Sequence, residues 1–311
     1  MKSLIVMCVL VFGSSVALAT GDYEAGQRLL ETKLDTAAAV TFRRGAEAGD
    51  AKSQFMLGNL LGSGRGVPRN EPEAAAWHRR AAEQGHAEAQ YVLARRYMTG
   101  RGVKRDMREA VAWLAKSPAL NQRHAQYVLG LFYLNGNAVE RSPETAAGWV
   151  MKSAQQGLPE AQGLLGNMYA ERIGVERDYE KAFEWRLKAA TVGNADAQAS
   201  LGYMYALAQG VEINYPAAIE WSLKAAHQGS TMAQSNLAEF YARGRRGIPR
   251  DFAKTYLWSG VALKTGVEDP RAASRVARSK MLAAKELPAG RVAELDVAIE
   301  RCWRKPATCP Q

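Results

Sequence analysis

The four histidines are the side chains best suited to acid–base or metal chemistry, and none stands in a spacing that such chemistry needs. They are His78, His86, His124 and His227. A zinc site on one helix typically uses HxxxH, as in HExxH, and no such pair occurs. We therefore expect the histidines to be solvated surface residues and not metal ligands.

Other catalytic arrangements are missing as well. No GxSxG word offers a nucleophilic serine, and Glu71 and Glu73 stand near an expected helix start, where carboxylates interact favourably with the helix dipole. The word Gly100-Arg101-Gly102 resembles a phosphate-binding loop, but it follows no predicted strand. We expect no catalytic residue, cofactor or metal ion, although a hydrolase acting on cell-wall derivatives remains a third hypothesis.

A repeat of 36 residues accounts for the sequence far better than a catalytic site does. Glutamine recurs at this spacing within similar words such as AEAQYVLA and PEAQGLLG, at Gln54, Gln90, Gln126, Gln162, Gln198 and Gln234. Six of the seven tryptophans follow the same period, with one inserted residue before the last, at Trp77, Trp113, Trp149, Trp185, Trp221 and Trp258. Such self-similarity is typical of repeat architectures. We expect the tryptophans to pack in the core.

Each repeat reads as two amphipathic helices. In the first, Ala89, Leu93 and Tyr97 form one apolar stripe at helical spacing. The position of Ala94 holds only Gly or Ala in every repeat, which predicts a close helix–helix crossing because Gly costs a helix up to about 1 kcal/mol.

A turn and a capping residue separate the two helices of each repeat. Glycine at Gly100 and Gly102 supplies the positive φ that ends the first helix. Side chains that cap helix N-termini then share one register, at Asn70, Asp106, Ser142, Asp178, Asn214 and Asp251. A single hairpin cannot bury its own apolar face, so the copies must stack. We predict an all-α, right-handed superhelical solenoid of helix-turn-helix hairpins.

Domain limits follow from this register. We expect a degenerate N-terminal capping repeat over residues 20–48, six repeats over 49–267, and C-terminal capping helices with a tail over 268–311. Arginine and lysine between Arg271 and Lys285 give the C-terminal cap a polar outer face.

Residues 1–19 have the composition of a cleavable secretory signal peptide. Lys2 is the positive start, residues 4–12 form the apolar core, and Ala17-Leu18-Ala19 is the small-x-small cleavage site. A retained membrane anchor is the alternative, but the apolar run is shorter than the roughly 20 residues that a bilayer requires. Cys8 lacks the small residues that precede a lipidation site. We predict cleavage after Ala19 and a periplasmic product without stable membrane insertion, monomeric when free.

Two cysteines remain after cleavage, Cys302 and Cys309. In an oxidising compartment a disulfide between them is the natural pairing, and closing so small a loop contributes roughly 2 to 3 kcal/mol in the chain-entropy model. A redox-active pair is the alternative, although CxxC spacing is missing.

Charge is unevenly distributed along the chain, whose formal net charge is +10. Residues 43–123 carry fifteen basic and eight acidic side chains, residues 124–240 eight and twelve, and residues 241–311 fifteen and seven. No nucleic-acid motif accompanies this charge, so we exclude nucleic acid as a partner. Anionic envelope lipid or an acidic protein surface fits the compartment, and a merely well-solvated surface is the alternative.

The recurring pattern AxAQxxLGxxYxxGxGVxxDxxxAxxWxxxAAxxG resembles that of the Sel-one-like repeat, a relative of the tetratricopeptide repeat. The match covers about two thirds of the chain, with departures at Asn135-Gly136-Asn137-Ala138 and at Ala115–Pro118. The resemblance implies an interaction scaffold and not an enzyme. Secreted bacterial members resemble envelope adaptors, regulators of sensor proteins, and periplasmic immunity proteins that neutralise phospholipase effectors of type VI secretion.

This resemblance leads to two functional hypotheses. The chain binds and neutralises a specific protein such as a secreted lipase effector, or it is an envelope adaptor or regulator of a sensor or surface-assembly system.

Partner binding should use the side of each first helix that the apolar stripe leaves free. The positions one and five after each glutamine point to that side and vary, and in a hairpin solenoid they line the concave groove. Candidate residues are Phe55, Asn59, Tyr91, Arg95, Tyr127, Leu131, Asn167, Tyr203 and Glu239. Aromatic rings beside an arginine have the composition of an interface hot spot. The alternatives are that neighbouring repeats cover these side chains or that binding uses the loop edge.

Overall fold

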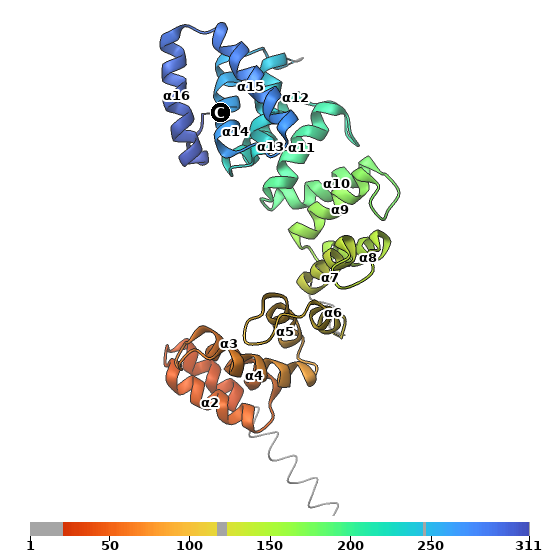
Figure 1. The fold of residues 1–311 in the computed structure, drawn as a ribbon, viewed down its shortest axis with the longest axis vertical. Coiled ribbons are helices and arrows are strands. Elements are labelled where there is room, and N and C mark those ends of the chain that lie inside the picture. The colour runs from red at the N-terminus through yellow and green to blue at the C-terminus, as the bar shows by residue number, and fades with distance from the viewer. Residues whose placement is uncertain (1–20, 117–122, 245–246, 311) are drawn as a thin grey trace, which may run out of the picture. The chain divides into compact units, whose positions relative to one another are not determined.

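The computed structural model describes residues 21–116, 123–244 and 247–310, and every element with defined bounds in them is helical (Figure 1). The expected signal peptide lies outside the described residues. The chain divides into two compact units, Met1–Ser142 and Pro143–Gln311, each of which is described by itself.

The first unit begins with helical residues 21–31 and continues as antiparallel hairpins. Its further helices are α2 (Asp35–Glu47), α3 (Ala51–Ser63), α4 (Glu71–Glu83), α5 (Ala87–Thr99), α6 (Met107–Lys116) and α7 (Arg123–Asn135).

The second unit continues the same alternation of helices and ends in two longer ones. Its elements are α8 (Pro143–Gln155), α9 (Pro159–Glu171), α10 (Tyr179–Thr191), α11 (Ala195–Leu207), α12 (Tyr215–His227), α13 (Thr231–Arg243), α14 (Phe252–Thr265), α15 (Pro270–Lys285), α16 (Ala289–Arg304) and the 3₁₀ turn η1 (Pro306–Thr308). The predicted all-α helical-repeat class is confirmed. Among the described helices, none combines the length and apolar character that crossing a bilayer requires.

The second helix of a repeat begins at a side-chain cap, as the sequence predicts. The Asn70 side chain accepts a hydrogen bond from the Glu73 N–H at 3.2 Å, and Asp178 accepts one from the Lys181 N–H at 2.9 Å. Equivalent caps are formed by Asp106, Asn214 and Asp251. Each cap satisfies a backbone donor that would otherwise lack an intrahelical partner, and contributes about 1 kcal/mol.

The Gly/Ala position of the first helix is a point of close helix contact. A Cβ placed on Gly58 would lie 2.7 Å from the His78 ring, and one placed on Gly166 would lie 2.6 Å from Arg186 Cγ. Both neighbours belong to the second helix of the same repeat. The predicted tight crossing is confirmed, and the glycine makes room for a large buried side chain on the opposing helix.

The Gly-Arg-Gly turns also join one repeat to the next. Gly102 has a φ of +73°, and a Cβ there would collide with the Glu71 carbonyl oxygen, at the start of the preceding second helix. The adjacent Arg101 pairs with the Glu71 carboxylate at 2.6 Å. One repeat earlier, Arg65 pairs with Asp35 at 2.7 Å in the same way. The turn therefore ends a helix and fastens it to its neighbour.

The tryptophan positions are less uniformly buried than the sequence suggested. Trp77, Trp113 and Trp258 are buried, whereas Trp149, Trp185 and Trp221 are half-buried. In each half-buried case the lysine three residues later lies over the ring, with its Nζ between 4.1 and 4.3 Å from the centroid. One ring face packs inward while the other forms a cation–π contact.

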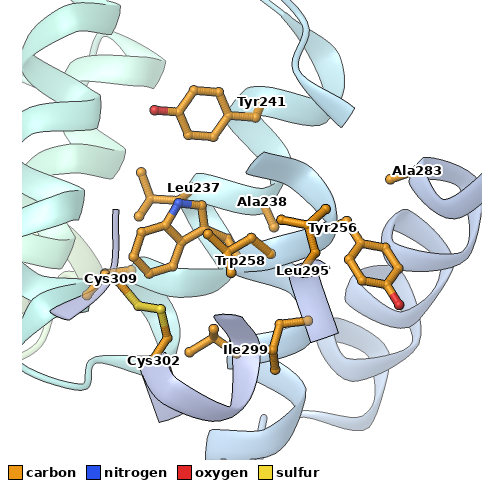
Figure 2. Close-up of a cluster of buried hydrophobic side chains, with 14 of the residues drawn as sticks. Leu237, Ala238, Tyr241, Tyr256, Trp258, Ala283, Leu295, Ile299, Cys302 and Cys309 are labelled. Atoms are coloured by element: carbon orange, nitrogen blue, oxygen red, sulfur yellow. A yellow bond between two sulfur atoms is a disulfide. The ribbon is translucent and has the colours of Figure 1, made fainter. Parts of the chain in front are cut away.

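Trp258 lies at the centre of the C-terminal core, completely buried among α13, α14 and α16 (Figure 2). The Cys302–Cys309 disulfide lies beside its ring, and both cysteines are buried. His227 contacts the carbonyl oxygen of Cys309 at 3.2 Å, which holds the tail against α12. The disulfide thus fixes the chain end onto the last hydrophobic cluster.

Candidate binding surface

The repeated glutamine orients the first helix in four of the hairpins, whereas the buried Gln234 lacks the corresponding bond. Gln54 and Gln90 are buried, and each donates its Nε2–H to the backbone carbonyl eight residues earlier at 3.1 Å. Gln162 and Gln198 do the same at 3.2 and 3.0 Å. This bond satisfies a carbonyl at the end of the preceding helix. The side chain one position later is thereby turned away from that helix.

Aromatic residues follow the glutamine in the first unit and are half-buried. The Phe55 ring stacks on His86 of the next repeat, with centroids 4.8 Å apart. The Arg95 guanidinium lies 5.9 Å from the Tyr91 ring, and His124 lies 6.4 Å from it. Tyr127 is half-buried as well. Neighbouring repeats therefore cover one part of the Phe55, Tyr91 and Tyr127 rings, and the rest of each ring remains exposed.

The candidates five positions after the glutamine have different environments. Asn59 Oδ1 accepts from His78 at 3.1 Å, and Asn167 Oδ1 accepts from Arg186 at 2.7 Å, so both amides are engaged within their own repeat. Leu131 is half-buried. Arg95 and Glu239 are exposed, and Tyr203 is 45% exposed.

His78 corrects our expectation that the histidines are solvated. Its side chain is completely buried on α4. Nδ1 accepts a hydrogen bond from Arg96 Nε at 3.0 Å, so the ring proton is assigned to Nε2, which donates to Asn59. Burial, and then the neighbouring Arg96 charge, lowers the pKa of His78 to about 3. The imidazole is neutral at physiological pH.

Glu71 anchors the same network with three arginines. Its carboxylate accepts from Arg69 at 2.6 Å, from Arg96 at 2.8 Å and from Arg101 at 2.6 Å. Partial burial by itself raises the pKa of Glu71, but the hydrogen bonds from Arg101, Arg96 and Arg69 outweigh it and lower the pKa to about 2.

Sequence reasoning missed this network although its register was visible. Arg96 occupies a position that is apolar and buried in the other repeats, at Leu60, Phe132, Met168, Met204 and Phe240. His78 likewise follows a tryptophan, where the neighbouring copies carry Leu114 and Val150. The network is closely packed and polar, and it joins α4 to α5. We assign it to holding these repeats together.

A groove opens over the first-helix side of the second unit. Its volume is about 1180 Å³, and residues of α11, α13 and α15 line it. Tyr203 and Glu239 both lie on its wall, and Glu239 forms an ion pair with Arg243 there at 2.9 Å. The structure therefore brings together two of the nine candidate residues in one hollow. The other seven lie outside it.

Side chains suited to metal binding do not converge in the part of the chain that the structure describes. No group of three or more His, Cys, Asp or Glu residues there could hold an ion. Peptide binding, through exposed rings, guanidinium groups and an open groove, is the chemistry that these surfaces support.

Comparison with known proteins identifies the repeat. The Sel1 repeat family model matches residues 51–86, 87–117, 123–158, 159–194, 195–230 and 231–259. A search of curated proteins finds no match.

Among solved structures, a Sel1 repeat protein from Oxalobacter formigenes is 27% identical with a TM-score of 0.67, over 80% of this chain and 98% of that one. The protective antigen c5321 of uropathogenic Escherichia coli is 22% identical with a TM-score of 0.50, over 93% of this chain and 85% of that one. The immunity protein Pa5087 from Pseudomonas aeruginosa is 23% identical with a TM-score of 0.39, over 75% and 81% of the two chains.

Proposed function

The chain belongs to the Sel1 repeat family, and from this premise we propose that it is a periplasmic scaffold that binds and sequesters one specific protein. Repeats of this family mediate protein–protein interaction. The observation that carries the proposal is the outward side of the first helices, where half-buried rings in the first unit and an open groove in the second remain available to a partner.

The role we favour is that of an immunity protein against a phospholipase effector of type VI secretion. This finer proposal rests on the sequence resemblance to secreted family members. The buried disulfide fits an oxidising compartment such as the periplasm, as does the expected signal peptide. The contact residues we propose are Phe55, Asn59, Tyr91, Arg95, Tyr127, Leu131, Asn167, Tyr203 and Glu239.

Co-expression tests this role directly. The chain is produced in the periplasm together with an effector encoded beside its gene, and growth is followed. We expect relief of toxicity. Continued killing by a folded, exported chain would contradict the immunity role while leaving protein binding open.

A tyrosine pair tests the contact surface. Tyr91→Ala combined with Tyr127→Ala should weaken binding of the captured partner at least tenfold and leave helical content unchanged, because two interface aromatics that contribute about 1 kcal/mol each exceed the roughly 1.4 kcal/mol of a tenfold change. Tyr179→Ala removes a half-buried tyrosine from the start of a second helix and is the matched control. Unchanged affinity in the double variant would refute the assignment of these rings.

An envelope adaptor or regulator is the second candidate. The excess of basic residues in 241–311 favours it, because such a surface attracts acidic partners. A deletion strain with altered envelope signalling or surface polymers, and without any change in effector sensitivity, would select this role over immunity.

A further inference from the structure

The α15 wall of the groove carries positive charge without a partner. Arg275 and Arg278 line the groove and are exposed, and neither forms an ion pair with any residue in the described ranges. Lys280 of the same helix is already engaged, since its Nζ lies 3.7 Å from Asp296 and 4.6 Å from the centre of the Tyr256 ring. The two groove arginines are therefore free to meet carboxylates from outside.

Apolar side chains line the same groove as these arginines. Tyr203, Leu207, Met232 and Leu282 line the groove from three helices, and each remains between 45% and 49% exposed. Large apolar side chains gathered at this exposure around one hollow indicate a surface that a partner covers.

Two of the three carboxylates that line the groove lie toward one end, and the third, Glu239, is paired with Arg243 at 2.9 Å. Asp196 is in the first turn of α11, and Glu268 stands just before α15. Because one antiparallel helix separates α11 from α13 and α13 from α15, these three run in the same direction. Both carboxylates therefore lie where the helices begin, and Arg278 and Leu282 lie further along, toward the end where Leu207 closes α11. Because Arg243 neutralises Glu239, that end is basic and apolar.

We propose that the groove binds an acidic amphipathic helix of the protein partner, which places apolar side chains against Leu207 and Leu282 and two carboxylates against Arg275 and Arg278. This inference rests on the proposed protein-binding function and names the chemistry of the segment that is bound. The two arginines are three residues apart on α15 and so lie one helical turn apart. Carboxylates three or four residues apart on a docking helix have a similar spacing.

The size of the groove supports a helix. Sites for small molecules are about 300–1000 Å³, and this groove, at about 1180 Å³, is larger. Guanidinium–carboxylate pairs formed beside an apolar contact are charge-assisted hydrogen bonds, which fix the register of the bound helix.

Binding of a designed peptide tests the proposal. The probe is a fluorescein-labelled helical 18-mer with leucine along one face and glutamate flanking it, and its companion carries glutamine in place of every glutamate. Fluorescence anisotropy is measured on the full mature chain at physiological salt. We expect the glutamate peptide to bind at least tenfold more tightly than its companion. Equal affinity, or no binding of either peptide, would overturn the proposal.

Two double variants of α15 locate the site. Arg275→Glu with Arg278→Glu should reduce the affinity for the glutamate peptide at least tenfold. Arg271→Glu with Lys285→Glu makes the same change of charge on exposed positions of the same helix outside the groove lining, and should reduce the affinity clearly less, because these side chains form no direct pair with the bound carboxylates and act only through solvent-screened charge. Equal losses in the two variants would refute the site.

Anionic phospholipid vesicles are the competing occupant. Vesicle binding that Arg275→Glu with Arg278→Glu abolishes, without binding of the glutamate peptide, would assign the arginines to a lipid surface and overturn the proposal.

Crosslinking separates failure of this inference from failure of the proposed function. A photoreactive residue is placed at Leu282 in the groove or at Tyr91 in the first unit, and periplasmic crosslinks are mapped. A crosslink from Leu282 to an acidic helix, lost in the groove variant and kept in the control variant, supports the inference. A partner captured from Tyr91 alone keeps the proposed function and overturns the groove assignment, and no capture from either position counts against both.

Discussion

Replacing His78 with leucine should make the chain less sensitive to mild acid. The imidazole is completely buried and its pKa is lowered to about 3 from 6.5. The unfolded chain therefore takes up this proton near pH 6.5, whereas the folded chain stays neutral. Because the unfolded state binds more protons, His78 lowers stability progressively as pH falls from 6.5 toward 3.

The magnitude follows from the shift. One pKa unit corresponds to about 1.4 kcal/mol, so protonation of His78 in the unfolded chain removes about 2.5 kcal/mol of stability between pH 7.5 and pH 4.5. His78→Leu abolishes this contribution and introduces the residue that the next repeat carries at the same position, Leu114. It also leaves Arg96 Nε without its acceptor, which lowers stability by an amount that is separate from the His78 titration.

Urea denaturation followed by circular dichroism, at intervals from pH 7.5 to 4.5, separates the two effects. We expect the difference in free energy of unfolding between wild type and variant to change by about 2.5 kcal/mol in favour of the variant as the pH falls over this range. His124→Leu removes an exposed imidazole and is the control for losing a histidine. Parallel pH curves for wild type and His78→Leu would refute the reasoning, because a buried neutral imidazole requires them to converge.

Four further substitutions test separate parts of the structure by urea denaturation. Glu71→Gln should cost about 2 kcal/mol at pH 7, discounted for solvent screening, and this difference should vanish between pH 4.5 and 2 as the folded carboxylate protonates. Gly166→Ala should destabilise by about 1–3 kcal/mol because its Cβ would lie 2.6 Å from Arg186, whereas Gly148→Ala, with open space around it, should stabilise α8 by up to about 1 kcal/mol. Cys302→Ser should cost about 2–3 kcal/mol, and reduction of the wild type should reproduce that loss.

Repetition explains why so much of the fold could be read from the sequence. A position filled only by Gly or Ala reports a close contact, and the structure places Gly58 and Gly166 at such contacts. Caps such as Asn70 and Asp178 act within three residues, so sequence spacing alone locates them. These features are local, or recur identically between neighbouring repeats.

The features that the sequence did not predict are single exceptions within a register. We assigned His78 to the surface by its residue type, although its position, one after a tryptophan, is buried in the neighbouring copies as well. Arg96 occupies a repeat position that is apolar and buried in the other copies, and only the structure shows that Glu71 and His78 accept hydrogen bonds from its guanidinium. The groove depends on the angle between α13 and α15, which no local spacing specifies.

The buried polar exceptions also constrain how repeats can be ordered. The junction between α10 and α11 corresponds to the junction between α4 and α5. There Arg186 on α10 occupies the position of His78, and Met204 on α11 occupies the position of Arg96. The buried arginine therefore lies on the helix before the junction and not on the helix after it. Arg186 is satisfied by Asn167 of its own repeat. Exchanging the two junctions would place a buried guanidinium at position 204, where Tyr179 stands in the register of Glu71, so the guanidinium would lack its carboxylate, at a cost of several kcal/mol. Apolar positions are interchangeable among repeats, and these polar pairs are not, so they favour one register among repeats that otherwise resemble one another.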